Sequence, residues 1–244
     1  EMSYTLGIDV SHWQDNNATS QRVDFAKAKR AGAQFVFIKA SQNQFAYEDF
    51  AYNWQAAKGA GLLRGAYHFY DYRYRADKQA EYLWSLIQDD PGELPPVLDA
   101  EPYWTPIPGR LGWLSGIQAF LAVIDQLAGR KAIIYSNPST LLSLKPLPPA
   151  LIEHPLWIAH YGVSSPNPSG WPRWTFWQFT DRLDGIAYGM ESKQLDGNYF
   201  NGTLDELRAW AGVDKPAPVE PPQPAPVTPP ADALQILWAD YLAR

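Results

Sequence analysis

Apolar runs rich in β-branched and aromatic residues alternate with amphipathic stretches along most of this 244-residue chain. Parallel strands need crossover connections of a dozen or more residues, usually helices, so the alternation predicts a parallel sheet with helical crossovers. Apolar residues make up 46% of the chain, which is enough for a folded core. Because about eight strands are expected, the predicted fold is α/β: an irregular, flattened (β/α)-barrel of the TIM type.

The expected strands are residues 5–9, 35–39, 64–69, 96–101, 132–135, 156–160, 175–179 and 194–196. Helices are expected at 23–31, 48–60, 75–88, 111–128 and 204–211. The connections 161–173 and 181–194 are rich in Gly, Ser, Pro and Asn, so loops or a hairpin replace the last helices in this prediction. Polar residues interrupt the apolar stretch 111–128, which favours an amphipathic helix and no membrane insertion.

The composition changes after residue 212, and eight of the 15 residues 216–230 are proline. Such a segment is typical of a semi-rigid spacer. The sequence therefore predicts a barrel domain at 1–212, a Pro-rich linker at 213–230 and a short helix at 231–244. That helix is too short to fold alone. It is either the start of a truncated module, a helix that docks on a partner, or a helix that packs back on the barrel.

Several chemistries are excluded by what the chain lacks. It has no Cys, and its four histidines show no His-Glu-x-x-His pattern, so we expect neither a metal nor a cofactor. It has no Gly-x-Ser-x-Gly elbow and no phosphate loop. The formal charge of −6 argues against nucleic acid as a partner.

Four acidic residues stand at the ends of expected strands. They are Asp9, Asp99, Glu101 and Asp196. In β/α barrels the reactive face is built from the C-terminal ends of the strands and the loops that follow. The first and last strands are neighbours in a closed barrel, so Asp9 and Asp196 are expected to converge. The alternative for each acid taken singly is a helix or turn cap.

Asp99 and Glu101 are two positions apart, so on a strand both side chains leave the same face. A neighbouring anion and a desolvating wall both raise the pKa of a carboxyl, which can leave one of the pair protonated near neutrality as a general acid. Two carboxyl groups with separate roles are the usual equipment for breaking a glycosidic bond.

Aromatic rings lie in or just after several expected strands, where they would line the same mouth as the acids. Flat rings of this kind stack on sugar faces, and the alternative is that they belong to the core. The expected substrate-binding residues are the aromatic residues Tyr67, Tyr135, Trp157, Tyr161 and Trp177, together with the amide Gln178 beside Trp177. His68 is interpreted as a buried barrel histidine.

Eight ordered motifs give residues 4–211 a resemblance to glycoside hydrolase family 25, the lysozymes that act as N-acetylmuramidases on peptidoglycan. Each motif is weak alone, but their order is specific. The motifs are Gly7-Ile8-Asp9-Val10-Ser11 with Trp13-Gln14, Phe37-Ile38-Lys39-Ala40-Ser41, Gly65-Ala66-Tyr67-His68-Phe69, Leu98-Asp99-Ala100-Glu101, Ile134-Tyr135-Ser136, Leu156-Trp157-Ile158-Ala159 with Tyr161, Trp177-Gln178-Phe179 and Leu195-Asp196-Gly197-Asn198.

The resemblance implies hydrolysis of the β-1,4 bond between N-acetylmuramic acid and N-acetylglucosamine. By the same resemblance, Glu101 is the proton donor and Asp99 orients or polarises the N-acetyl group of the substrate. Asp9 and Asp196 would set the charge at the floor of the active-site cleft. Family members commonly have Thr-Glu-Gly where this chain has Ser41-Gln42-Asn43, so the cleft lining near that strand is expected to differ from theirs.

Two other function classes stay open: a chitinase-like or glucosaminidase-like hydrolase, and a non-catalytic sugar-binding module of the cell wall. The expected partner is the glycan strand of peptidoglycan, and the protein is expected to be a monomer. The first residues show no basic and apolar signal segment. We expect action outside the cell or at the cell wall, as a secreted autolysin, a defence enzyme or a lysin released by a phage.

Overall fold

The computed structural model describes residues 3–15, 19–103 and 109–213, which lie in one compact unit that ends at Val213. The predicted linker at 213–230, apart from Val213, and the predicted helix at 231–244 lie outside the described residues and stay predictions.

Eight strands close into a barrel, as predicted. The sheet order is β1-β9-β8-β7-β6-β5-β4-β2-β3, and pairing of β1 with β2 closes it, while β3 forms only a short hairpin with β2. The strands of the described residues are β1 (Thr5–Val10), β2 (Phe35–Gln42), β3 (Phe45–Ala46), β4 (Leu63–Phe69), β5 (Val97–Asp99), β6 (Ile133–Ser136), β7 (Leu156–Ala159), β8 (Phe176–Asp184) and β9 (Gln194–Phe200).

The last strand departs from the parallel pattern, because β9 runs antiparallel to both β8 and β1. The connection 185–193 is too short for a crossover, so the chain returns as a hairpin in which Asp184 pairs with Gln194. Asp196 therefore stands near the start of its strand and not at its end. The reversed direction still brings it to the edge where the parallel strands end.

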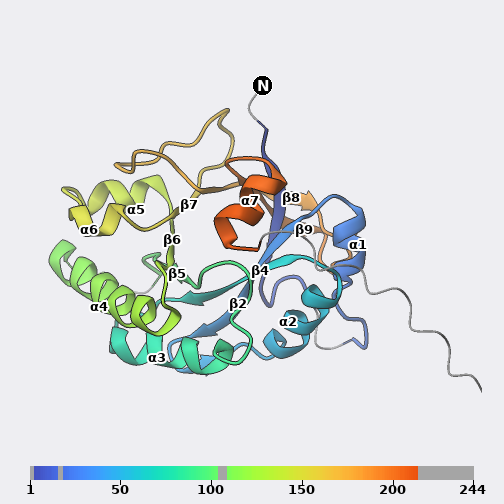
Figure 1. Cartoon of the computed structure of the whole chain (residues 1–244), viewed down its shortest axis with the longest axis horizontal. Coiled ribbons are helices and arrows are strands. Elements are labelled where there is room, and N and C mark those ends of the chain that lie inside the picture. Colours follow the sequence, from blue (N-terminus) through green and yellow to red (C-terminus); the bar gives the residue numbers. More distant parts are fainter. Residues whose placement is uncertain (1–2, 16–18, 104–108, 214–244) are drawn as a thin grey trace, which may run out of the picture. The chain divides into compact units, whose positions relative to one another are not determined.

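Helices lie around the barrel and across one of its ends (Figure 1). They are α1 (Phe25–Arg30), α2 (Phe50–Gly59), α3 (Ala76–Ile87), α4 (Arg110–Ala128), α5 (Pro138–Ser143), α6 (Pro149–Ile152) and α7 (Leu204–Ala211). The short helices α5 and α6 were not expected. The connections from β7 to β8 and from β8 to β9 contain no helix, which agrees with the predicted loops and hairpin.

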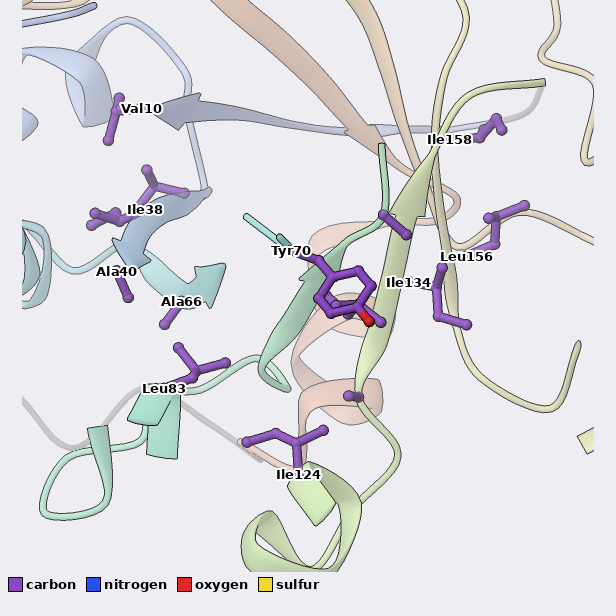
Figure 2. Packing of buried hydrophobic residues seen from close by; sticks show 14 of the residues in the cluster. Val10, Ile38, Ala40, Ala66, Tyr70, Leu83, Ile124, Ile134, Leu156 and Ile158 are labelled. Atoms are coloured by element: carbon purple, nitrogen blue, oxygen red, sulfur yellow. The ribbon is translucent and has the colours of Figure 1, made fainter. Parts of the chain in front are cut away.

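Side chains alternate between the two faces of each strand. Val36, Ile38 and Ala66 point outward and pack in the layer between barrel and helices, part of which Figure 2 shows. Their neighbours Phe35, Phe37 and others point inward. The rings inside pack closely: Phe37 stacks on Trp157 at 4.2 Å between centroids and meets Phe176 edge-on at 5.0 Å. The lower part of the barrel is thus filled with aromatic rings.

Helix α4 has the length and apolarity that would allow a membrane span, with a mean hydropathy of 1.3 over 18 residues. In the structure it packs against α3, and one face is buried in the core. The buried residues of that face are Trp113, Leu114, Ile117, Phe120, Leu121 and Ile124. Such a face is typical of a core helix in a globular domain.

Helix α7 closes the end of the barrel where the parallel strands begin. A capping box between Thr203 and Glu206 starts the helix. Leu207 is fully buried in the inner cluster, and the ring of Trp210 lies 5.5 Å from that of Phe176. The helix therefore seals the aromatic interior from solvent at the end opposite the acids.

Replacing Leu207 by Ala should lower the free energy of unfolding by about 2–5 kcal/mol, because it leaves a cavity under the aromatic interior. Urea denaturation measures this change. Leu111→Ala is the matched control, since Leu111 is 74% exposed on α4, and it should change stability by about 0.5 kcal/mol or less. Equal effects of the two substitutions would contradict the role given to α7.

Candidate active site

The four predicted acids line one cavity at the mouth of the barrel, with a volume of about 320 Å³. Asp9 and Asp99 come from β1 and β5, Asp196 comes from β9, and Glu101 follows β5 by two residues. The remaining lining is aromatic or polar: Ser11, His12, Trp13, Lys39, Gln42, Tyr67, Phe69, Tyr103, Tyr135, Trp157, Tyr161 and Gln178.

Asp9 and Asp196 face each other because β1 and β9 pair in register at these two residues. The buried Asp9 carboxylate accepts hydrogen bonds from Gln178 Nε2 at 2.8 Å and Asn198 Nδ2 at 2.7 Å. Burial raises the pKa of Asp9, and these bonds oppose the rise. Burial and the charge of Asp9 raise the pKa of Asp196 to about 9. The two facing carboxyl groups titrate as a pair, so the raised pKa indicates a proton held between them.

Asp99 ends β5 with its side chain inside the barrel. Its Oδ1 atom is buried and has no hydrogen-bond partner within the described part of the chain. Burial raises the pKa of Asp99 well above its usual range, and the neighbouring Glu101 raises it further, while Lys39 lowers it. An acceptor atom in this state is available to a donor on a bound molecule.

Glu101 is held by the start of α5. Asn137 caps this helix by accepting a hydrogen bond from the Thr140 backbone N–H at 3.0 Å, which fixes its amide. Its Nδ2 then donates to Glu101 Oε1 at 3.1 Å. Burial raises the pKa of Glu101, whereas the bond from Asn137 lowers it. The net direction is upward, which favours a protonated carboxyl at the cavity wall.

A chain of neutral donors fixes the floor of the cavity. The hydroxyls of Tyr135 and Tyr161 donate to Gln178 Oε1 at 2.7 and 2.6 Å, and Gln178 in turn donates to Asp9. In parallel, Trp157 Nε1 donates to Asn198 Oδ1 at 2.7 Å. The orientation of Asp9 thus depends on side chains from β6, β7, β8 and β9.

Trp177 does not line the cavity, and this prediction needs correction. On β8 the side chains of Phe176 and Gln178 point inward, so Trp177 between them points outward. It is 5% exposed, donates to the His160 carbonyl at 2.8 Å and packs against Trp174. The other five predicted substrate-binding residues line the cavity. His68 is fully buried on the outer face, where Ser41 and Gln79 hydrogen-bond it.

Sequence reasoning missed the side of the cavity formed by the end of β2. Lys39 follows Phe35 and Phe37 on the inward face, and its Nζ donates to Gln42 Oε1 at 3.0 Å. The same two-residue alternation that placed Asp99 would have found Lys39. Gln42 takes the position where the resembling family has Glu. Asn43 follows it with φ of 51°, a conformation that suits Gly or Asn.

The cavity holds carboxyl groups but no arrangement for a metal. Within residues 3–15, 19–103 and 109–213, no group of three or more His, Asp or Glu side chains is placed to hold an ion. What the arrangement offers is proton transfer by a carboxyl of raised pKa beside a buried acceptor.

The protonated Asp196 makes a testable contribution to stability. Its folded pKa of about 9 exceeds the unfolded value of 3.8, so the folded state binds more protons between these limits. The free energy of unfolding should therefore fall as pH rises towards 9. Asp196→Asn keeps a donor towards Asp9 and has no proton to lose, so it should show a smaller fall. Urea denaturation at pH 5, 7 and 9 measures both; parallel curves would contradict this assignment.

Comparisons with known proteins agree with this geometry. Residues 8–186 match the sequence pattern of glycosyl hydrolases family 25. Lysozyme M1 of Streptomyces globisporus is 36% identical over 231 residues, which cover 86% of this chain and 72% of that protein. An N,O-diacetylmuramidase of Chalaropsis sp. is 31% identical over 227 residues, with 84% and 98% covered.

The fold matches as well. The bacterial lysozyme from Streptomyces coelicolor superposes with a TM-score of 0.74 at 31% identity, covering 86% of this chain and 98% of that one. A family 25 glycosyl hydrolase from Bacillus anthracis gives a TM-score of 0.73 at 27% identity, with 84% and 92% covered. The chain therefore belongs to glycosyl hydrolases family 25, and it is a glycoside hydrolase with a TIM-like barrel.

Proposed function

We propose that this enzyme is a lysozyme that hydrolyses the β-1,4 bond between N-acetylmuramic acid and N-acetylglucosamine in peptidoglycan. The observation that carries the proposal is the pair of Asp99 and Glu101, two carboxyl groups of raised pKa at one cavity wall. The names of the relatives, a lysozyme and an N,O-diacetylmuramidase, favour this bond over those cut by chitinases or glucosaminidases. The enzyme would act at the cell wall, after secretion or release by a phage.

In this proposal Glu101 is the general acid. Burial keeps its carboxyl protonated to higher pH than in an exposed glutamate, and the bond from Asn137 to Oε1 holds this carboxyl at the cavity wall. The proton passes to the glycosidic oxygen as the bond from that oxygen to the anomeric carbon breaks. The resulting Glu101 carboxylate then takes a proton from the water that attacks the anomeric carbon in the second step.

Asp99 assists the N-acetyl group of the substrate. Its unpartnered Oδ1 accepts the acetamido N–H, which turns the acetamido oxygen towards the anomeric carbon. That oxygen forms a bond to the carbon while the leaving group departs, and water later displaces it. Such assistance by the substrate is one of the known exceptions to the scheme with two protein carboxyl groups. A carboxyl oxygen of Asp99 can accept this N–H whether or not the group is protonated, and Lys39 offsets only part of the rise in the Asp99 pKa.

The remaining cavity residues position the sugar. Asp9 and Asp196 lie on the cavity floor with raised pKa values, and negative charge on this pair would favour an oxocarbenium-like transition state. Tyr161 is 44% exposed at the rim and offers a ring face to a sugar. Tyr67, Tyr135, Trp157 and Gln178 lie deeper and shape the floor.

Glu101→Gln should lower the rate of peptidoglycan digestion by about 10² to 10⁴-fold, because the amide cannot donate the proton. The new reducing ends are identified by mass spectrometry after borohydride reduction. The wild type should yield reduced muramic acid ends.

Glu153→Gln is the matched control, because Glu153 is an exposed glutamate at the end of α6, and it should retain full activity. Reduced glucosamine ends would contradict the proposed bond. Binding to cell walls without any cleavage by the wild type would favour the non-catalytic module.

A further inference from the structure

Two further hollows lie along the short hairpin of β2 and β3. A second hollow of about 220 Å³ shares Lys39 and Gln42 with the cavity that holds the acids, and Phe45 also lines it. A third hollow of about 320 Å³ shares Phe45 with the second and reaches Tyr74 beside the start of α3. Because each hollow shares lining residues with the next, we treat the three as one groove along the hairpin.

The hairpin places Phe45 on the wall of this groove. In the antiparallel pairing of β2 and β3, Phe45 lies directly opposite Gln42, and opposed residues project from the same face. Gln42 lines the cavity of the acids, so the ring of Phe45 extends the same wall. The turn is defined, because Asn43 adopts a left-handed conformation and the Tyr47 N–H bonds the Ala40 carbonyl at 2.8 Å.

Phe45 is 72% exposed, and Tyr74 is 53% exposed. Neither residue contributes its ring to the buried clusters. A large apolar ring left in water next to a substrate groove is a feature of binding surfaces, since its free energy is gained only when a ligand covers it.

The other residues of the third hollow indicate the chemistry of the ligand. Asn43 and Gln44 bring amide groups, which can both donate and accept hydrogen bonds. The cations Arg75 and Lys78 are paired with Asp77 and Glu81 at 2.5 and 2.6 Å. Two aromatic rings with neutral amides suit a pyranose ring and its hydroxyls better than a charged peptide.

We propose that Phe45 and its neighbours form an accessory subsite for a sugar of the glycan strand, distant from the bond that is cut. The proposal rests on the function proposed above and adds a preference for long glycan strands. The subsite acts on binding only, because its residues lie apart from the carboxyl groups that transfer the proton.

The test measures the affinity of peptide-free glycans of increasing length by calorimetry, in the full chain with Glu101→Gln so that bound glycans stay intact. Adding Phe45→Ala should weaken binding of long glycans about tenfold, which corresponds to about 1.4 kcal/mol, and leave the shortest unchanged. Phe45→Trp should keep the affinity. Tyr52→Ala is the control, since Tyr52 is 42% exposed on α2 outside the groove, and it should bind as the parent does.

An effect of Phe45→Ala that is equal at every length, or absent at every length, would overturn the subsite. A loss seen only with peptide-bearing glycans would also overturn it and would assign the groove to the stem peptide. The digestion assay tests the proposed function separately, because it uses a chain in which Phe45 is intact. A failure of the subsite therefore leaves the result of that assay unchanged.

Discussion

The aromatic rings packed inside the barrel create the low-dielectric floor on which the whole site depends. Phe37, Trp157 and Phe176 fill the space below the mouth, so the carboxyl groups above them are cut off from water on one side. Burial is the leading cause of the raised pKa of Asp9, Asp99, Glu101 and Asp196. The packing that stabilises the fold is therefore also what raises the pKa of these acids.

The hydrogen bonds to these acids come from neutral groups more than from cations. Asp9 is bonded by two amides and Glu101 by a third, and such bonds orient a carboxyl without forcing it to ionise. Arg pairs would have lowered each pKa strongly. Lys39 is a cation on the cavity wall, and it bonds the neutral Gln42. Where the family commonly has Glu, this chain leaves that ammonium without a carboxylate partner from the same strand.

Much of the site could be predicted because strand alternation is a strong signal. Asp9, Asp99 and Glu101 all line the cavity, as their positions at strand ends indicate. The same alternation contradicts the prediction that Trp177 binds substrate, because Trp177 lies between Phe176 and Gln178, which both point inward.

Other features were missed or were harder to predict. The Asn137-Pro138 pair is a helix-start signal that could have revealed α5. The direction of β9 was harder to predict. The short connection between β8 and β9 determines this direction only once the ends of both strands are known. The exposure of Phe45 depends on tertiary contacts that local sequence does not contain.

Burial keeps the carboxyl groups of Asp99 and Glu101 protonated at higher pH than ordinary acids. Site-resolved ¹³C NMR titration of the carboxyl carbons in the ligand-free enzyme tests it most directly, with Glu101→Gln to assign the signals. We expect a Glu101 pKa above 4.5 and an Asp99 pKa well above 3.8. Titration of both groups at or below these ordinary values would contradict it.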